Sequence, residues 1–563
     1  MAFIQAAPQL GNQYDDDRVL RDFLTRTLPS DVHRAIEPSL REMGALAGGE
    51  LFALSERYRD AEPELIQWDP WGNRIDEIRV TPAWEIYARR AVEHGLIATA
   101  YERRQAQHSR LHQFALVYLF HASSQIYTCP LSMTDGAART LEVHGSSALR
   151  ERAIPRLTSR DPHYAWTSGQ WMTEQIGGSD VGLSETLARQ SSEGWRLYGT
   201  KWFTSATTSD MALTLARPEG NGPGGRGLAM FYLEQRTADG RLNGIRINRL
   251  KDKLGTRALP TAELELDGTL AEPVAGLADG TRMITPMLNI TRTWNAVCAV
   301  SSMRRGIALA RDYASRRRAF GASLSDKPLH LDTLATMQAE FEAAFSLVFF
   351  SVSLLGREEV GIITDEERAL LRLLQPITKL LTAKQAIAVA SETLEAFGGA
   401  GYVEDTGLPV LLRDTQVLSI WEGTTNVLAL DAFRAIAREG GLAPFLAAAR
   451  TRAQAVTHSA LRDPARLVLA TADHAEQWLA ETQRRDAAVL EASARRFAFT
   501  LGRTLELALL LESAQWAIDR RRDYRAAAAA ARFASSGIDA LTTPERIAAA
   551  NRALALDEEW SQL

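Results

Sequence analysis

Cysteine is nearly missing from this chain, whose 563 residues include only Cys129 and Cys298. Two cysteines cannot form the disulfide framework of a small secreted domain, so we expect a reducing compartment. No apolar run approaches the roughly 18 residues of a membrane span, and the N-terminal stretch lacks the layout of a signal peptide. We therefore expect a cytoplasmic protein without a membrane partner.

An excess of positive charge is missing as well. The formal net charge of −5 argues against a globally basic nucleic-acid binder, although it still allows a local basic patch. His474 and Glu476 form a His-x-Glu, but no Cys-x-x-Cys completes a zinc site, so we expect no metal. Gly222–Gly227 matches Gly-x-Gly-x-x-Gly in form. Because it leads into a strand-like segment rather than a helix, we interpret it as a loop and not as a nicotinamide site.

What the chain does contain is an ordinary globular composition, with 46% hydrophobic and 24% charged residues. The chain is too long to fold around a single hydrophobic core, and at about 150 residues per domain we expect three or four domains. Helical spacing runs from residue 15 to about 165, short alternating segments between turn residues follow, and helical periodicity then returns. We predict an α+β chain with helical residues 1–163, a β domain at 164–283, a helical domain at 284–440 and a helical extension at 441–563.

Glu422 is the first candidate catalytic residue. It lies in the segment Ser419–Asn426, where Ile420, Trp421 and Gly423 surround its carboxylate. If buried there, the carboxylate would be partly desolvated, which raises its pKa toward the range useful for proton abstraction. The alternative is that Glu422 complements the dipole and the free N–H groups of a helix that starts at this point.

A second motif, Met172–Val181, places two glycines beside hydroxyl side chains. Gly177 and Gly178 allow positive φ and close backbone approach, while Thr173 and Ser179 can hold the polar rim and the phosphates of a cofactor. A surface turn rich in Gly, Ser and Asp is the alternative interpretation.

A third motif, Gly199–Ser205, follows about 20 residues later and contains Lys-Trp-Phe-Thr-Ser. With these three motifs in this order, the chain resembles the acyl-CoA dehydrogenase family over roughly residues 60–440. Further segments are similar to its AidB branch, the adaptive-response flavoproteins named for induction by alkylating agents, and extend the resemblance over nearly the whole chain. These segments are Leu65–Pro70, Pro82–Trp84, Cys129–Leu131, Lys201–Phe203, Arg249–Gly255 and Ile420–Gly423.

The resemblance implies the acyl-CoA dehydrogenase fold, in which an N-terminal helical domain, a middle β domain and a helical bundle follow one another. Here an extra C-terminal helical domain would be added. It also implies FAD as the cofactor. The residues that it assigns to cofactor binding are Gln170, Met172, Thr173, Ser179, Phe203, Thr204, Ser205, Arg317, Phe320, Ile420, Trp421, Gly423, Thr424 and Asn426. Phe203 matches the aromatic residue packed against the flavin, and Ser205 matches a hydroxyl near N5. Arg317 matches an arginine that reaches the FAD of a neighbouring subunit, which implies a homotetramer.

The implied reaction is α,β-dehydrogenation of an acyl-CoA. Glu422 would take the α-proton while the β-hydrogen leaves as hydride to flavin N5. Arg292 matches an arginine near the base and would tune it electrostatically, with a structural ion pair as the alternative. We expect weak turnover of a short or branched acyl-CoA, with electron-transfer flavoprotein or oxygen as the acceptor. Trp171, Trp202 and Trp421 would either narrow the acyl pocket or serve as core aromatics.

The same resemblance implies an alternative function, association with double-stranded DNA to protect it from alkylation damage, with little dehydrogenase turnover. Residues 441–563 hold 16 Arg, 15 acidic residues and no Lys, a near balance that lacks the strong basic signature typical of DNA binding. The candidate basic clusters are Arg484–Arg485, Arg495–Arg496 and Asp519–Arg525, to which Arg434 would add. Solvated helix faces are the alternative interpretation.

Overall fold

The computed structural model describes residues 5–484, 487–541 and 550–560, which separate into two units. The N-terminal unit holds Gln9–Arg305 and Gly398–Leu418. The C-terminal unit holds the described residues up to Pro8, Gly306–Phe397 and the described residues from Ser419 on. These units cut across the four domains predicted above, whose boundaries stay a prediction.

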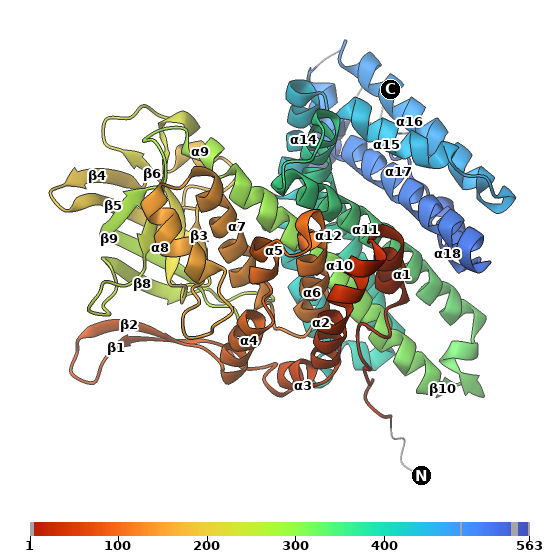
Figure 1. The fold of residues 1–563 in the computed structure, drawn as a ribbon, viewed down its shortest axis with the longest axis horizontal. Coiled ribbons are helices and arrows are strands. Elements are labelled where there is room, and N and C mark those ends of the chain that lie inside the picture. Colours follow the sequence, from red (N-terminus) through yellow and green to blue (C-terminus); the bar gives the residue numbers. More distant parts are fainter. Residues whose placement is uncertain (1–4, 485–486, 542–549, 561–563) are drawn as a thin grey trace. The chain divides into compact units, whose positions relative to one another are not determined.

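Helices form most of the N-terminal unit outside its sheet (Figure 1). Their bounds are α1 Arg18–Thr27, α2 Ser30–Gly48, α3 Glu50–Arg57, α4 Pro82–Glu93, α5 Ala98–Glu102, α6 Ser109–His121, α7 Thr128–His144, α8 Ser147–Leu157, α9 Gly280–Met283 and α13 Leu408–Gln416. Helix α10, Thr285–Arg316, begins in this unit and ends in the other. The local sequence determines where α1 begins, because the Asp17 carboxylate caps this helix by accepting from the N–H of Leu20 at 3.0 Å.

A buried charged network joins three helices of this unit. The Arg110 guanidinium of α6 donates to both carboxylate oxygens of Asp135 in α7, at 2.8 and 2.9 Å. The indole N–H of Trp294 in α10 donates to the same carboxylate at 2.8 Å. All three side chains are almost fully buried, so these polar groups rely on one another rather than on water. The network therefore fixes how α6, α7 and α10 pack.

A β-hairpin interrupts the predicted run of N-terminal helices. Strands β1, Glu64–Trp68, and β2, Arg74–Arg79, pair antiparallel, which corrects the expectation of helices throughout this region. The hairpin contacts strand β8, Ile245–Leu250, through the buried carboxylate of Asp76, which accepts from the N–H of Ile247 at 2.9 Å. Periodicity missed the hairpin because its strands are only five and six residues long, too short for a clear alternation.

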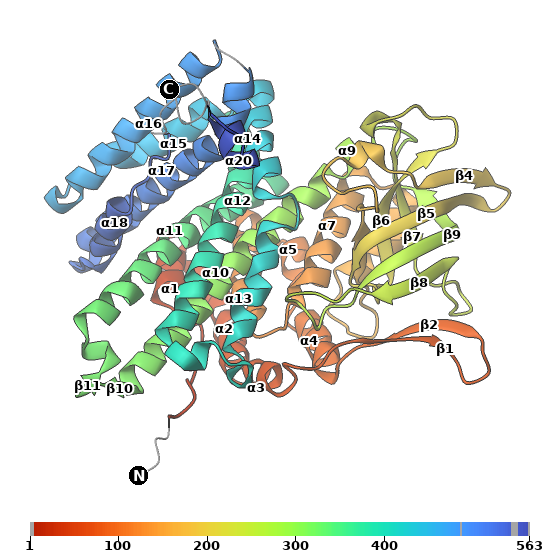
Figure 2. The same cartoon turned by 180° about the vertical axis from the view of Figure 1, so that it is seen from behind.

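The middle of the chain forms one sheet of seven strands (Figure 2). Besides β8, the strands are β3 Ser168–Trp171, β4 Leu187–Ser191, β5 Gly194–Ser205, β6 Met211–Pro218, β7 Ala229–Glu234 and β9 Thr261–Pro273. Their hydrogen-bonded order is β3-β6-β4-β5-β9-β7, β8 pairs with β9, and β7 also pairs with β6. The last pairing closes the sheet into a ring around an apolar core that includes Trp171, Leu197 and Phe231. The predicted α+β class is confirmed.

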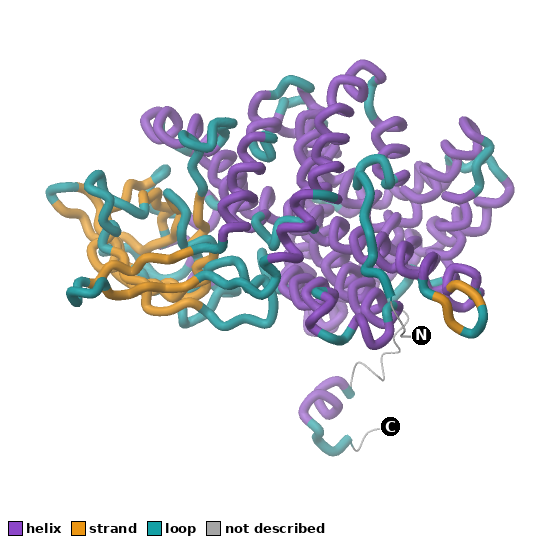
Figure 3. The backbone as a smooth tube through the Cα atoms, turned by 90° about the horizontal axis from the view of Figure 1, so that it is seen from below, coloured by secondary structure: helices purple, strands orange, loops and turns teal. Residues whose placement is uncertain are grey.

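Long helices build the C-terminal unit. They are α11 Pro328–Glu359, α12 Asp365–Ala396, α14 Thr425–Glu439, α15 Leu442–Gln454, α16 Arg462–Thr482, α17 Ala487–Arg521, α18 Arg525–Ser535 and α20 Asn551–Leu556. Thr364 and Glu367 form a capping box at the start of α12, and Gly398 takes a φ of 61° just after its end, as the sequence predicts. Two short strands, β10 Arg318–Ala319 and β11 Ala322–Ser323, form a hairpin of their own before α11 (Figure 3).

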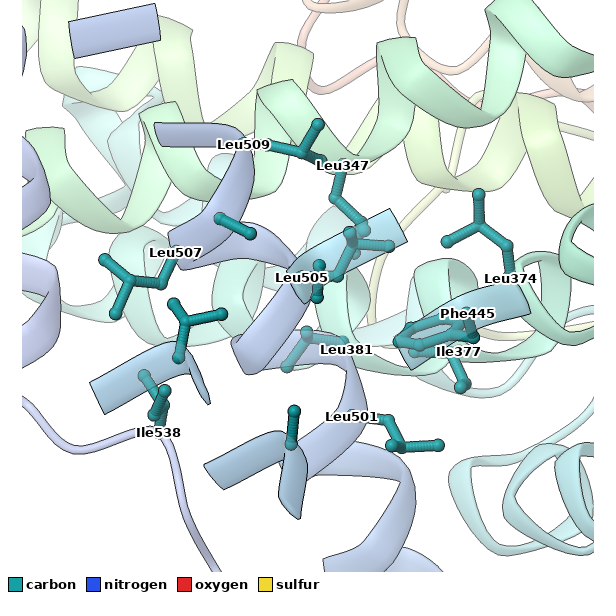
Figure 4. Packing of buried hydrophobic residues seen from close by; sticks show 14 of the residues in the cluster. Leu347, Leu374, Ile377, Leu381, Phe445, Leu501, Leu505, Leu507, Leu509 and Ile538 are labelled. Atoms are coloured by element: carbon teal, nitrogen blue, oxygen red, sulfur yellow. The ribbon is translucent and has the colours of Figure 1, made fainter. Parts of the chain in front are cut away.

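One apolar core runs from α11 and α12 into the C-terminal extension. Figure 4 shows Leu347 of α11 and Ile377 and Leu381 of α12 packed in one cluster with Leu501 of α17. Gly502 lets α17 approach α12 closely, because a Cβ there would lie 2.6 Å from Leu381 Cδ2. The extension is therefore part of the bundle's core rather than a separate module.

Helix α11 departs from one expectation. Among the described residues it is the helix long and apolar enough to cross a membrane, whereas the sequence suggested no such run. Most of its apolar window is buried inside the protein. A core position accounts for that composition, because a helix that is apolar nearly all round must be covered by other elements.

Ion pairs also attach the extension to α11. Arg503 of α17 donates to the two carboxylate oxygens of Glu340, at 3.0 and 3.1 Å. Arg525, which opens α18, pairs with the buried Glu342, and Arg532 makes a similar pair nearer the start of α11. Several arginines of the extension therefore serve its packing.

Candidate functional site

A buried ion pair anchors the segment that follows strand β3. Glu174 accepts from the Lys201 ammonium of β5 at 2.7 Å. Its carboxylate also accepts from the backbone N–H of Glu185 and from the Thr186 hydroxyl, both at 2.6 Å. Burial alone would raise the pKa of Glu174, but the Lys201 charge and these hydrogen bonds hold it below the usual value. Glu174 is therefore ionised at neutral pH, and it ties the loop to the strand.

This anchor brings the second and third motifs together. The N–H of Trp202 donates to the carbonyl of Thr173 at 3.0 Å, so Thr173 lies beside the strand that carries Phe203. Gly178 lies against Thr173, since a Cβ there would come within 2.8 Å of the threonine hydroxyl oxygen, and Gly177 has a φ of 144°. The backbone of the loop therefore favours glycine at position 177, and a side chain at position 178 would require the Thr173 side chain to shift.

Phe203 presents an exposed aromatic face. Its side chain is 57% exposed and meets the Trp202 ring edge to face, with the ring centroids 6.5 Å apart. The Lys251 ammonium lies 3.6 Å from the centroid of the Trp202 ring and donates to Glu263 at 2.6 Å, which holds Trp202 in place. An exposed aromatic ring bordered by hydroxyl groups fits the flat ring system and polar edge of a flavin.

The other predicted residues of this region differ in burial. Gln170, Met172 and Ser205 are half-buried, Ser179 is exposed, and Thr204 is buried. Because side chains alternate along a strand, the buried Thr204 faces the sheet interior while its neighbours face outward. Thr204 is better placed to support β5 than to present its hydroxyl at the surface, and the cofactor roles of all five residues stay predictions.

The burial of Trp171 decides between its two interpretations. Its side chain is almost fully buried in the core of the sheet, and a Cβ on Gly169 would come within 2.5 Å of its indole nitrogen. Trp171 is therefore a core aromatic. Trp202 and Trp421 are half-buried, and their part in shaping an acyl pocket stays a prediction.

Glu422 lies in a strained turn just before α14. It has a φ of 58°, in the left-handed region that disfavours L-residues, and Gly423 follows with a φ of 106°. The helix starts at Thr425 with Thr424 as its N-cap, so Glu422 precedes the cap by two residues instead of lying in the first turn. The positive end of the helix dipole still faces this segment. Glu422 is half-buried, less enclosed than its apolar neighbours in the sequence suggest.

The residues around Glu422 mix apolar and polar surface. Ile420 is 60% exposed and Trp421 is half-buried, while Thr424 and Asn426 are exposed. The hydroxyl of Thr424 makes no capping hydrogen bond to the helix. Exposed hydroxyl and amide groups beside the free N–H groups of a helix N-terminus suit the phosphates of a nucleotide cofactor.

Arg317 and Phe320 belong to the short hairpin before α11. Phe320 is 97% exposed at its tip, with a φ of 50°. The Lys327 ammonium donates to the Phe320 carbonyl at 2.9 Å, which closes the tip. Arg317 is half-buried directly after α10. An exposed phenyl ring at a braced tip suits contact with another molecule, and the contact of both residues with a neighbouring subunit's FAD stays a prediction.

The structure thus gathers one group of predicted residues around β3 and β5 and another around the start of α14. Arg292 is half-buried in α10, within the N-terminal unit, whereas Glu422 belongs to the C-terminal unit. The effect of Arg292 on the base stays a prediction.

Sequence reasoning missed Glu174 and Lys201 as positioning residues. Their signal was an acid in the second motif and the single lysine of the third, but their pairing across 27 positions follows only from the sheet.

Comparison with known proteins places these features in one family. Residues 278–437 match the acyl-CoA dehydrogenase C-terminal domain, and residues 169–269 match the middle domain. Acyl-CoA dehydrogenase family member 11 of Caenorhabditis elegans is 42% identical over 91% of this chain and 86% of its own length. The chain belongs to the acyl-CoA dehydrogenase family. It is an oxidoreductase of that family, and the predicted fold with its added C-terminal helical domain is confirmed.

The two ends of this acyl-CoA dehydrogenase also have known relatives. Residues 6–164 match the adaptive response protein AidB N-terminal domain, and residues 442–559 match the acyl-CoA dehydrogenase 11 C-terminal domain-like family. The AidB protein of Escherichia coli K12 is 32% identical over 69% of this chain and 71% of its own length. The predicted AidB-like relationship is confirmed.

Solved structures agree with this assignment. The structure of C. elegans ACDH-11 in complex with C11-CoA has a TM-score of 0.94 and 38% identity, and the match covers 100% of this chain and 98% of that chain. An acyl-CoA dehydrogenase from Bacillus anthracis complexed with FAD has a TM-score of 0.70 at 17% identity, covers 99% of this chain and 96% of that chain, and shares the fold. Members of the family bind FAD.

Proposed function

We propose that this acyl-CoA dehydrogenase binds FAD and oxidises the Cα–Cβ bond of an acyl-CoA thioester, with Glu422 as the base. The observation that carries the proposal is the strained turn before α14, which places Glu422 two residues ahead of the N-cap of that helix. Strained backbone of this kind is concentrated at functional sites. The likeness to a relative solved with C11-CoA supports the substrate class.

Two groups of residues would hold FAD. Phe203 would cover one face of the flavin ring, while Met172, Thr173 and Ser205 would line its polar edge. Thr424 and Asn426, at the N-terminus of α14, would serve the nucleotide phosphates. When bound, FAD accepts the β-hydrogen of the substrate as hydride. The exposure of Phe203 and the unused hydroxyl of Thr424 support this assignment.

The chemistry of this chain's own residues is proton transfer. The Glu422 carboxylate takes the proton from the α-carbon, the electron pair forms the Cα=Cβ bond, and a hydride leaves the β-carbon. General-base catalysis of this type contributes roughly 10²- to 10⁴-fold in rate.

The substrate proposal now includes a medium-length acyl chain beside the short or branched one expected from the sequence, because the relative with a TM-score of 0.94 was solved with C11-CoA. The acceptor is proposed to be an electron-transfer flavoprotein, with oxygen as the alternative. Steady-state turnover with each acceptor separates the two.

Anaerobic absorbance of the FAD-loaded protein tests the function. We expect one or more acyl-CoAs from a panel of four to sixteen carbons, C11-CoA included, to bleach the flavin. Glu422→Gln, which keeps the size of the side chain and removes its basicity, should slow bleaching at least about 10²-fold. Equal rates in the wild type and the variant would exclude Glu422 as the base. FAD content measured in both proteins serves as the control.

A second proposal is association with double-stranded DNA, with little dehydrogenase turnover. It is supported by arginines at exposed positions, namely Arg434, Arg495, Arg520, Arg521 and Arg522. Arg484 is exposed too, and Arg485 lies outside the described residues. Arg525, from the same cluster, is instead engaged with Glu342. A gel mobility shift with duplex DNA at low salt measures the association, and flavin bleaching decides between the two proposals.

A further inference from the structure

The turn that carries Glu422 needs support from outside itself. Glu422 and Gly423 have positive φ values of 58° and 106°, and such a turn persists only when its surroundings hold it. A side chain at Gly423 would also crowd Leu428, whose Cδ2 would lie 3.1 Å from its Cβ. The helix end gives limited help, because Thr424 caps it without a side-chain hydrogen bond.

Lys379 supplies a contact to this turn from α12. Its side chain is fully buried, and its ammonium donates to the carbonyl oxygen of Gly423 at 2.7 Å. An ammonium group is costly to bury unless it is paired or hydrogen-bonded, and a charge-assisted hydrogen bond is stronger than a neutral one. The fold thus keeps a cation in its interior and directs it at the residue after Glu422.

A second cation of α12 holds α14 independently. Arg372 lies seven residues before Lys379, about two helical turns away and on the same side of α12. It donates to Asp431 of α14 at 2.7 Å. Arg372 therefore holds the body of α14, whereas Lys379 holds the turn that precedes it. The attachment of the helix and the shape of the turn depend on different residues.

We propose that Lys379 is a positioning residue for proton abstraction, which fixes the Glu422–Gly423 turn and so sets the direction of the Glu422 carboxylate. The inference rests on the proposed function, in which Glu422 is the base. The carbonyl held by Lys379 is that of Gly423, so the contact restrains the Gly423–Thr424 peptide plane, one residue beyond the base. Misplacing a reacting group by about 1 Å can cost about 10²-fold in rate.

Anaerobic stopped-flow bleaching of the FAD-loaded enzyme tests this role, with C11-CoA as the first probe and the fastest thioester of the panel otherwise. Lys379→Met removes the donor, and Lys379→Gln keeps an N–H donor on an uncharged side chain. Arg372→Met is the matched control, because it removes a different, half-buried cation of α12 that pairs with acids of α14, namely Asp431 and Glu439. We expect Lys379→Met to slow the limiting rate about 10²-fold. The half-saturating thioester concentration and the FAD content should stay within about twofold, Lys379→Gln should recover part of the rate, and Arg372→Met should keep it.

A double variant shows whether Lys379 acts through Glu422. Added to Glu422→Gln, the Lys379→Met substitution should change the residual rate little, since the group that it positions no longer acts as a base. An additive loss in the double variant would overturn the inference.

The remaining outcomes separate the two proposals. If Glu422→Gln bleaches as fast as the wild type, the proposed function fails and the positioning role fails with it. If Glu422→Gln is slow but both Lys379 variants keep the wild-type rate, only the positioning role fails. Equal slowing by Lys379→Met and Arg372→Met would show a purely structural contact and would also overturn it. Should Lys379→Met lose FAD, Lys379→Gln is the deciding variant.

Discussion

At the scale of single residues, the ion pair of Glu174 and Lys201 combines a structural and a functional task. It lies inside the sheet, yet it fixes the loop and the strand that present Thr173 and Phe203. Removing one partner of a buried pair leaves the other charge unpaired, which typically costs about 3–5 kcal/mol.

We therefore expect Lys201→Met to lower the free energy of unfolding by about 3–5 kcal/mol. Urea unfolding followed by tryptophan fluorescence measures the loss. Adding Glu174→Gln to Lys201→Met should restore part of it, because no buried charge is then left without a partner. A loss below about 1 kcal/mol in the single variant would show that the Glu174 carboxylate finds another partner.

The sequence predicts the identity of the residues at this scale better than their environment. The motif around Glu422 and the two glycines of the second motif stand out from residue type and order alone. The positive φ of Glu422, the core position of Trp171 and the inward face of Thr204 depend on packing by distant segments. No local pattern encodes that packing.

At the scale of elements, helix α17 carries a buried acid into the core that it shares with α12. The carboxylate of Glu506 is fully buried and accepts from the Gln385 side-chain amide at 3.2 Å. Burial raises the pKa of Glu506 well above its usual value, and the nearby Arg503 offsets this only in part.

This raised pKa makes the stability depend on pH. Because the folded state holds the proton more tightly than the unfolded state, the stabilising contribution is complete below the unfolded pKa of about 4.3. As the pH rises from there toward the folded pKa, the contribution falls by about 1.4 kcal/mol per pH unit. We expect Glu506→Gln to gain stability relative to the wild type between pH 5 and pH 8, measured as the difference in urea midpoints at the two values. A pH-independent difference would show that Glu506 titrates normally.

Elements differ in how far the sequence reveals them. Helices such as α12 show clear periodicity, a capping box and a terminal glycine, and the sequence predicts where α12 ends. The β1–β2 hairpin was missed because its strands are short and contact β8, a partner about 180 positions away. Helix α11 has an apolar sequence because it is buried in the core. That position becomes evident only from the helices that pack around it.

At the scale of the whole molecule, the net charge is −5, so the exposed arginines of the extension belong to a protein that is acidic as a whole. DNA binding driven by phosphate contacts weakens steeply with salt, roughly in proportion to the number of phosphates that the protein neutralises. Arg520, Arg521 and Arg522 are exposed and contiguous, so they are the first residues to change.

If the DNA proposal holds, replacing these three arginines by glutamine should weaken binding across sequences. The salt slope should fall by about one for each phosphate that is no longer neutralised. Arg466→Gln is the control, since that exposed arginine pairs with Asp463. Mobility shifts from 50 to 200 mM salt measure both quantities, and an absence of binding by the wild type at 50 mM would exclude the proposal.

The order of motifs and helical stretches is local information, which is why the sequence alone predicts the fold class of this acyl-CoA dehydrogenase. It cannot show that the extension shares a core with α11 and α12, because that contact joins residues more than 100 positions apart. The arginines of the extension illustrate the limit. Arg525 belongs to a basic cluster in the sequence, yet it is held by Glu342 of α11.

The close approach at Gly502 links two kinds of contact between α17 and α12. Gly502 faces Leu381, and four residues further along each helix Glu506 meets Gln385. Residues four apart lie on one face, so the two contacts form consecutive rungs between the same pair of helices. A larger side chain at position 502 would force the helices apart and stretch the polar rung next to it. The steric fit at Gly502 therefore affects the proton affinity of the Glu506 carboxylate. We expect substitutions at the Gly502–Leu381 contact and at the Glu506–Gln385 contact to depend on one another.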